Sequence, residues 1–244
     1  MRLLQLNAWQ GRLKRVLLKQ LETSGVDIAC MQEIVNYDKW SFGLVGPSKS
    51  IQEALGCEYS YMSPLMTMEF NGVPMKFGNA IYSKFPLEDT STNFTRGQYT
   101  ENYDHETMMD YNIRAFQHAV IKAGGTPLHI INHHGHHIDA HKNGDEETER
   151  QMQMIADYIS HLDGAVIVCG DFNLAPESAS IQLLSDSLRN LAVEYGLTTT
   201  RSKLTTKKEV CDYIFVNDQV NVENFYMIDE IISDHNGLVI DFSL

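Results

Sequence analysis

The chain has 244 residues, 43% of them hydrophobic, and a formal net charge of −13 at pH 7. This composition supports a sizeable globular core, and no apolar run approaches the roughly 20 residues of a membrane-spanning helix. The excess of acidic residues argues against a protein that grips duplex nucleic acid through its phosphates. The apolar run at the start is too short, and too broken by polar residues, to be a secretory signal.

Nothing in the sequence divides the chain into separate domains. It contains no Pro/Ser/Gly-rich linker, low-complexity tract or internal repeat. We therefore expect one domain over residues 1–244. The four cysteines form no CxxC pair, and three lie in apolar runs where a reduced cysteine acts as a small hydrophobic residue. Disulfides are not expected, and a cytoplasmic location fits this cysteine usage best.

The first third of the chain predicts a strand, a helix and a second strand. The first apolar run ends at Asn7, and apolar residues between positions 13 and 21 have helical spacing that stops at Ser24. The run VDIACM leads to Glu33 and predicts a buried strand. Residues 36–78 and 86–112 show no clear pattern, so we expect two long irregular segments there, of the kind that carries substrate specificity.

The rest of the chain alternates strands and helices. Residues 115–122 and 128–132 are strand-like and are joined by Gly-Gly-Thr-Pro, which predicts a hairpin. Apolar residues at intervals of three and four predict a helix over 148–162, and acidic residues before it suit a helix start. The strand AVIVC follows, then a helix over about 180–195, then the strands CDYIFV and LVIDF. Helices flanking mixed, mainly antiparallel sheets indicate a layered α/β sandwich.

Several of these apolar runs supply polar residues at or near their ends, and strand ends can converge on one rim of a sheet. The residues are Asn7, Glu33, His134, Asp171, Asn173, Asp212, Asp234 and His235. They offer carboxylate and amide oxygens and two imidazoles, without a thiolate or a serine nucleophile. Such a set suits a hard divalent cation and a phosphate ester. Glu33 is the most direct candidate ligand for Mg²⁺ or Mn²⁺, and Asn7 can add an oxygen.

The segment Cys-Gly-Asp-Phe-Asn at 169–173 is the strongest single signal. Asp171 and Asn173 lie on the same side if the chain stays extended. Asp171 can then accept a proton from a water, while Asn173 donates a hydrogen bond to a phosphoryl oxygen or orients Asp171. The alternative is a structural turn and helix cap made by the same residues.

Asp212 interrupts an apolar run, and a buried carboxylate needs a partner. A hydrogen bond to His235 would fix the tautomer of that imidazole and favour its charged form. The alternative for Asp212 is a structural acid satisfied by backbone amides. The pair Asp234-His235 can also bind a metal or polarise a phosphate.

The ordered series LNAW, MQE, GNAIYSKFPL, INHH, GDFNLAPES, CDYIFV and SDHNGLVIDF resembles the endonuclease/exonuclease/phosphatase superfamily, which has the fold of DNase I. The resemblance spans nearly the whole chain, and GDFN and SDH are its most specific parts. It implies a four-layered αββα sandwich that hydrolyses phosphate esters with a divalent metal, Mg²⁺ or Mn²⁺, at one end of the sandwich. It also implies that Asn7 and Glu33 hold the metal, that Asp234 assists the metal or the water, and that Asp171 activates or orients the attacking water.

The same resemblance assigns the residues that contact the phosphate. Asn173 and His134 would stabilise the phosphoryl group, Asp212 would orient His235, and His235 would contact the phosphate. Arg114 matches a frequent arginine of the family and is a candidate for substrate binding.

A histidine-rich segment, residues 129–141, departs from the usual Asn-Thr-His-Leu pattern, because His133 replaces the threonine and Gly-His-His follows His134. The extra histidines are either polar loop residues or ligands for the substrate or a second metal. A metallo-β-lactamase-like HxHxDH site is disfavoured, since Ile138 stands where that pattern needs an aspartate.

One basic cluster, Arg201, Lys203, Lys207 and Lys208, is either a solvated loop or a loop that receives an anionic substrate. A compact phosphate ester needs only the metal, two histidines and Arg114 or Arg201, so we predict a small substrate rather than duplex DNA. The alternatives are a nuclease acting on DNA or RNA and a catalytically silent binding module. The second would have lost some of the polar residues that are all present here.

Overall fold

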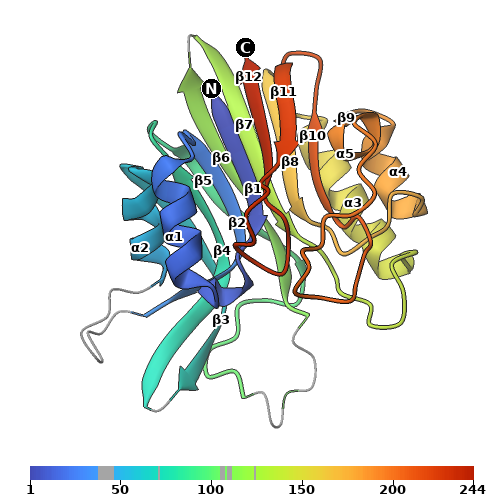
Figure 1. Ribbon diagram of the computed structural model, residues 1–244. Coiled ribbons are helices and arrows are strands. Elements are labelled where there is room, and N and C mark those ends of the chain that lie inside the picture. The colour runs from blue at the N-terminus through green and yellow to red at the C-terminus, as the bar shows by residue number, and fades with distance from the viewer. Residues whose placement is uncertain (38–46, 71, 105–107, 109–111, 124) are drawn as a thin grey trace.

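The computed structural model describes residues 1–37, 47–70, 72–104, 108, 112–123 and 125–244. Two six-stranded sheets pack face to face, with helices on the outer face of each (Figure 1). The strand orders are β11-β12-β1-β2-β4-β3 and β5-β6-β7-β8-β10-β9. The predicted four-layered αββα sandwich is confirmed.

The first sheet contains β1 (Arg2–Asn7), β2 (Ile28–Asn36), β3 (Tyr59–Phe70), β4 (Val73–Ser83), β11 (Asn221–Met227) and β12 (Leu238–Ser243). The second contains β5 (Glu88–Arg96), β6 (Arg114–Ala123), β7 (Thr126–His134), β8 (Ala165–Asp171), β9 (Arg189–Asn190) and β10 (Asp212–Val216). The helices are α1 (Lys14–Thr23), α2 (Pro47–Leu55), α3 (Glu146–Ile159), α4 (Ala179–Ser185) and α5 (Leu191–Glu194), with a short 3₁₀ turn, η1, at Trp9–Gly11. Only the pairs β1–β2 and β7–β8 are parallel among the ladders of the described strands.

The strand sequences explain the layers. The central strands are buried on both faces, so they read as continuous apolar runs. One set of their side chains, including Leu3, Ile130 and Ile214, meets between the sheets. The opposite set packs under helices: Leu4 lies with α1 and α2, and Val168 lies with α3 and α4.

The predicted helices at 13–21 and 148–162 are present. In α1, Leu17 and Leu21 are buried against the sheet. At the start of α3, Thr148 donates its backbone N–H to Asp145 Oδ1 at 2.9 Å, and the N–H of Asp145 donates to Thr148 Oγ1 at 2.8 Å. This reciprocal cap satisfies backbone donors that a helix start leaves unpaired.

Two predictions about secondary structure were wrong. The segments expected to be irregular contain α2, β3, β5 and residues 73–78 of β4, whereas the rest of β4 lies in the strand-like run GNAIYS; residues 38–46, 71, 105–107 and 109–111 lie outside the described part of the chain. The helix expected over 180–195 is interrupted, because Arg189 and Asn190 pair with β10 and separate α4 from α5. The hairpin predicted between 115–122 and 128–132 is present as β6 and β7.

Candidate active site

The candidate site lies at the end of the sandwich opposite the chain termini, which is the lower end in Figure 1. The parallel pairs β1–β2 and β7–β8 both finish there, so their carboxyl ends bring Asn7, Glu33, His134 and Asp171 to one rim. A cavity of about 670 Å³ opens at this rim. Its polar walls include Glu33, Arg114, His134, Asp171, Asn173, Arg201, Asp234 and His235. Asn7 and Asp212 lie behind this wall, in contact with residues that line it.

Asn7 joins the two sheets at the rim. Its Nδ2 donates to Glu33 Oε1 and to Asp171 Oδ2, both at 3.0 Å, and its Oδ1 accepts the backbone N–H of Trp9 at 3.0 Å. Glu33 reaches this position from a β-bulge, where β2 and β4 shift register between Met31 and Ile34. The φ of Glu33 is +54°, a conformation that a non-glycine residue rarely adopts and that is common at functional sites.

The carboxylates at the rim fit a divalent cation. Burial raises the pKa of Glu33, and the nearby carboxylates of Asp171 and Asp234 raise it further, against the lowering effects of Asn7 and His235. Carboxylates this close together repel one another unless cations lie near them, and carboxylate oxygens are ligands that Mg²⁺ and Mn²⁺ prefer. Glu33, Asp171 and Asp234 are therefore the residues that could hold a metal, and Asn7 could join them only through Oδ1, because its Nδ2 faces Glu33 and Asp171.

A second group of ligand atoms among the described residues fits a metal less well. Atoms of Asp171, Cys211, Asp212 and His235 lie within 4.8 Å of one another. Asp212 and His235 are already hydrogen-bonded to each other, and the guanidinium of Arg201 contacts His235 Nε2. A cation there would have to displace a guanidinium, so we place the metal on the Glu33 side.

The loop after β8 presents Asp171 and Asn173. Gly170 precedes them with φ +150°, and a Cβ at this position would overlap the backbone carbonyl of His133 in the neighbouring strand, so only glycine fits. Asp171 Oδ1 accepts the backbone N–H of Asn173 at 3.0 Å. Lys142 Nζ donates to Asn173 Oδ1 at 3.0 Å, which fixes which end of this amide is the acceptor.

Asp212 and His235 form a buried pair. His235 Nδ1 lies 2.8 Å from Asp212 Oδ2 and 3.0 Å from Oδ1, and neither residue is more than 3% exposed. Asp212 also accepts hydrogen bonds from Thr200 Oγ1 at 2.6 Å and Gln5 Nε2 at 3.1 Å. The carboxylate keeps a proton on Nδ1 of His235, so Nε2 points toward Asp171, 3.6 Å from its Oδ2.

The charges of neighbouring residues shift the pKa values of His235 and Asp171. Burial alone would lower the pKa of His235, but Asp212 and Asp171 outweigh it and hold that pKa well above the usual value. Burial alone would raise the pKa of Asp171, and the positive charges of His235 and Arg201 reverse this, so its pKa lies below the usual range. Asp171 is therefore an anion at neutral pH, facing a cationic side of the pocket.

His134 and Arg114 line the same cavity from the ends of β7 and β6. His134 Nε2 is 3.9 Å from Asp171 Oδ2. Burial, with the positive charge of Arg114, holds the pKa of His134 well below its usual value, so the ring is neutral at pH 7. Arg114 is itself buried, and its Nε donates to the Gly135 carbonyl at 2.6 Å.

Arg201 enters the pocket because residues 200–202 pair with residues 234–236. The N–H of Asn236 donates to the Thr200 carbonyl at 2.8 Å, and the N–H of Ser202 donates to the Asp234 carbonyl at 2.9 Å. Arg201 is buried, with Nη1 3.9 Å from Asp234 Oδ2. The predicted basic cluster is thus divided: Arg201 and Lys207 line the cavity, whereas Lys203 and Lys208 are exposed and do not line it.

The histidine-rich segment is also divided. Only His134 and His137 of that segment line the cavity. His133 is fully buried beside the ring of Phe172, at 5.2 Å between ring centroids, and His129 is stacked on His118 in the second sheet. Of the six histidines, two line the cavity, two are strand positions away from it, and His136 and His141 lie in the loop after β7.

Sequence reasoning missed several residues of the site. Lys142 comes from the loop between β7 and α3, which has no pattern that links it to Asn173, whereas His137 of the same loop belongs to the histidine-rich segment already singled out. The apolar wall of the cavity, from β3 and β4, was hidden in a segment expected to be irregular. Asn79 also lines the cavity and follows the glycine of the GNAIYS motif, a signal that could have singled it out.

A row of buried amides connects the site to the middle of the sandwich. Gln5 Nε2 donates to Gln32 Oε1 at 3.1 Å, and Gln32 Nε2 donates to Asn132 Oδ1 at 2.6 Å. Asn132 Nδ2 lies within hydrogen-bond distance of Gln117 Oε1 and of the carbonyls of Met31 and Ala80. Because Gln5 also contacts Asp212, this row fixes the two sheets relative to each other directly beneath the site.

The family model described as "Endonuclease/Exonuclease/phosphatase family" matches residues 4–235. The chain belongs to this family. Its members hydrolyse phosphoester bonds and use divalent metals. No curated protein matches the sequence.

Solved structures of this family share the fold of the chain. A Leptotrichia buccalis protein described as an endonuclease/exonuclease/phosphatase family protein has 19% identity and a TM-score of 0.73, with 100% of both chains covered. A mannosyl-6-phosphatase from Bacteroides thetaiotaomicron has 14% identity and a TM-score of 0.68, and an AP endonuclease from Archaeoglobus fulgidus has 18% and 0.66, each with full coverage of both chains. These family members have different substrates, so the fold does not choose among substrates.

Proposed function

We propose that this protein is a divalent-metal-dependent hydrolase of small phosphate esters, with Mg²⁺ or Mn²⁺ as the metal. The observation that carries the proposal is that one pocket brings carboxylates and cations together. The carboxylates of Glu33, Asp171 and Asp234 gather near Asn7, and the cationic groups lie beside them: Arg201 Nη1 is 3.9 Å from Asp234 Oδ2, and His235 Nε2 is 3.6 Å from Asp171 Oδ2. A phosphate ester needs both, because its oxygens bind cations while its attacking water needs a base.

The geometry supports a role for each residue. Glu33, Asn7 and Asp234 would hold the metal, which supplies charge stabilisation to the phosphoryl oxygens when bound. Asp171, an anion fixed by Asn7 and by the N–H of Asn173, would orient the attacking water and take its proton.

The phosphate itself would be bound by groups from the second sheet and the loops. His134 and Asn173 would donate hydrogen bonds to its oxygens, and Arg114 and Arg201 would add positive charge. His235 would face the phosphate through Nε2, because Asp212 occupies Nδ1.

The metal assignment is tested with Glu33→Gln, which keeps the side-chain size but removes the charge. We expect loss of turnover and weaker Mg²⁺ binding in calorimetry, with an unchanged melting temperature in the absence of metal. Glu22→Gln, on an exposed position of α1, is the matched control. Full activity of Glu33→Gln, or of chelator-treated wild type, would remove Glu33 and the metal from the proposal.

The substrate size is tested against the second candidate function, a nuclease. We expect kcat/KM at least tenfold higher for some small phosphate ester than for duplex DNA at physiological salt, or roughly 1.4 kcal/mol in transition-state stabilisation. Neutralising the exposed Lys203 and Lys208 should leave turnover of the small ester unchanged. Nicking of plasmid DNA that outpaces every small ester and is lost in this double variant would make the protein a nuclease.

The proposal extends to organisation and location. Each sheet takes strands from both halves of the chain, since β1 lies beside β12 in one sheet and β5 shares the other sheet with β8 and β10, and this supports one domain over residues 1–244. All four cysteines are buried and free, which supports a cytoplasmic location. No helix among the described residues is long and apolar enough to cross a membrane.

A further inference from the structure

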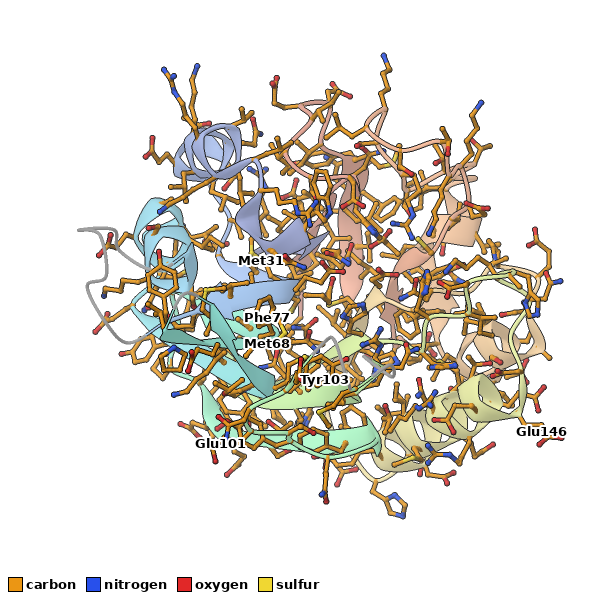
Figure 2. The ribbon with its side chains drawn as sticks, turned by 90° about the horizontal axis from the view of Figure 1, so that it is seen from below. Met31, Met68, Phe77, Glu101, Tyr103 and Glu146 are labelled. Atoms are coloured by element: carbon orange, nitrogen blue, oxygen red, sulfur yellow. The ribbon has the colours of Figure 1, made fainter. Side chains whose placement is uncertain are left out.

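The wall of the cavity that faces away from the rim cations is apolar, which a phosphate alone does not need. Leu65, Met66 and Met68 of β3 and Phe77 of β4 line the same cavity as Asp171 and His235. Figure 2 shows Met68, Phe77 and Tyr103 close together on this side of the molecule. The described part of the chain thus gives the site two chemically different halves.

The apolar half is built from two segments. Met66 is the register partner of Phe77 in the β3–β4 ladder. Residues 100–103 dock on the edge of β3: the N–H of Thr100 donates to the Leu65 carbonyl at 3.2 Å, and the N–H of Tyr103 donates to the Thr67 carbonyl at 2.7 Å. This docking packs Tyr103 against Leu65 and Met66, with Met68 and Phe77 partly buried beside them.

Met68 and Phe77 are only half-buried although both are apolar and lie inside a cavity. Apolar side chains that line a cavity next to convergent polar groups are typical of a small-molecule site. Methionine side chains adapt to the shape of a ligand and contact aromatic rings favourably through sulfur, and phenylalanine and tyrosine favour edge-to-face or offset contacts with another ring.

We propose that the substrate is a phosphate ester whose organic group is aromatic and apolar, and that Met68 and Phe77 determine this specificity. The inference rests on the proposed function for the position of the phosphate. A sugar or glycerol group that lies against this wall would turn hydroxyls toward thioether and ring carbon, which do not replace the hydrogen bonds to water, and this costs binding energy.

The test compares esters that share a primary-alcohol leaving group, so that leaving-group chemistry does not decide the result. Phenethyl phosphate, hexyl phosphate and glycerol phosphate are assayed with Mg²⁺. We expect kcat/KM for the phenethyl ester at least tenfold above that for the glycerol ester and above that for the hexyl ester, with the difference mainly in KM. A glycerol ester that equals or exceeds the phenethyl ester overturns the proposal, and a hexyl ester that exceeds it assigns the wall to aliphatic groups instead.

Two variants connect the preference to the wall. Met68→Gln keeps the side-chain length and should raise KM for the phenethyl ester at least fivefold, while leaving KM for the glycerol ester unchanged. Phe77→Leu stays apolar but removes the ring, and should reduce the preference for phenethyl over hexyl. The matched control is Met62→Gln, because Met62 also lies in β3 and is half-buried but packs toward α2. Equal effects of Met62→Gln and Met68→Gln, or equal effects of Met68→Gln on both esters, would show a structural role only.

A binding measurement separates this inference from the proposed function. Phenethylphosphonate cannot be hydrolysed at the phosphorus–carbon bond, and its affinity is measured by calorimetry for the wild type and Met68→Gln. Binding that is weakened at least fivefold in Met68→Gln, with no turnover of any ester, would retain the aromatic subsite and refute the hydrolase. Turnover of the esters with identical phosphonate binding in both proteins would refute the subsite and retain the hydrolase.

Discussion

The pairing of Asp212 with His235 gives a quantitative prediction. Asp212→Asn preserves the volume of the side chain and lets its amide oxygen keep accepting from Gln5 or Thr200, which contact Asp212 at 3.1 and 2.6 Å. The negative charge disappears, however, so Nδ1 of His235 faces a neutral amide in place of a carboxylate whose two oxygens both approach it. The imidazole then loses the charge that raises its pKa.

The expected magnitude follows from one charge-assisted hydrogen bond, which contributes about 1.5–3 kcal/mol. If that bond supports the transition state, its loss lowers kcat by about 10- to 150-fold. KM should change little, because Asp212 lies behind His235 and does not line the cavity. Asp212 is thus a positioning residue.

The assay is steady-state kinetics on a small phosphate ester, together with an NMR titration of the His235 ring nitrogens. We expect a lower pKa for His235 in Asp212→Asn and unchanged near-ultraviolet circular dichroism. Asp218→Asn, at an exposed position after β10, is the control and should leave both readouts unchanged. A wild-type kcat in Asp212→Asn, with the His235 titration shifted, would refute the claim that the charge of this pair supports catalysis.

Two further predictions concern stability. Asn132→Leu should lower the free energy of unfolding by about 3–6 kcal/mol, because it leaves several buried partners, among them Gln32 and Gln117, without hydrogen bonds; a loss below about 1 kcal/mol in urea denaturation would contradict this. Burial, with the charge of Arg114, lowers the pKa of His133 to about 3, so the unfolded chain binds a proton there first as the pH falls. The stability contributed by neutral His133 should be fully present above about pH 6.5 and be lost between about pH 6.5 and 3. His133→Gln should flatten this part of the pH profile, and an unchanged slope would show that other groups cause it.

The parts of the fold predicted from sequence are those with buried faces. β1, β2, β8 and β10 are covered on both sides and therefore read as apolar runs, and α1 and α3 show the spacing of a helix with one buried face. The missed strands are different. β5 has one buried residue, Thr95, so it shows no alternation of buried and exposed positions, and β3 and β5 are both edge strands of their sheets. The sequence of β5, EDTSTNFTR, is polar and rich in serine and threonine and resembles a loop, whereas β3 contains a proline, Pro64, that argues against a strand.

The break between α4 and α5 has a local cause that periodicity cannot detect. Leu184, Leu188 and Leu191 continue the helical spacing and are buried, which is why one helix was expected. In the structure, Asn190 pairs with Phe215 across to β10 and then caps α5, accepting the N–H of Val193 at 3.3 Å. Tertiary pairing with a strand more than twenty residues away decides the conformation of this segment.

The polar half of the site could be predicted because its residues follow strands, and the carboxyl ends of the two parallel pairs meet at one rim. The apolar half could not, because it requires the β3–β4 hairpin and the docking of residues 100–103 on its edge. Lys142 illustrates the same limit, since it reaches Asn173 from a loop 31 positions away. The sequence shows which polar residues follow a strand, but only the folded loops determine which other side chains reach the same site.

The position of Arg201 changes how the net charge of −13 should be interpreted. Net charge describes the average field around the protein and disfavours a long polyanion, but the charge within a pocket is set by the few groups that line it. Arg114, Arg201 and Lys207 all line the cavity, and Lys142 contacts Asn173 at its wall. The net negative charge of the protein therefore acts on ligands over long distances, whereas the cations that line the cavity act at short range. A compact anion that enters the pocket meets these cations at close range, whereas the net charge of −13 disfavours a long duplex backbone.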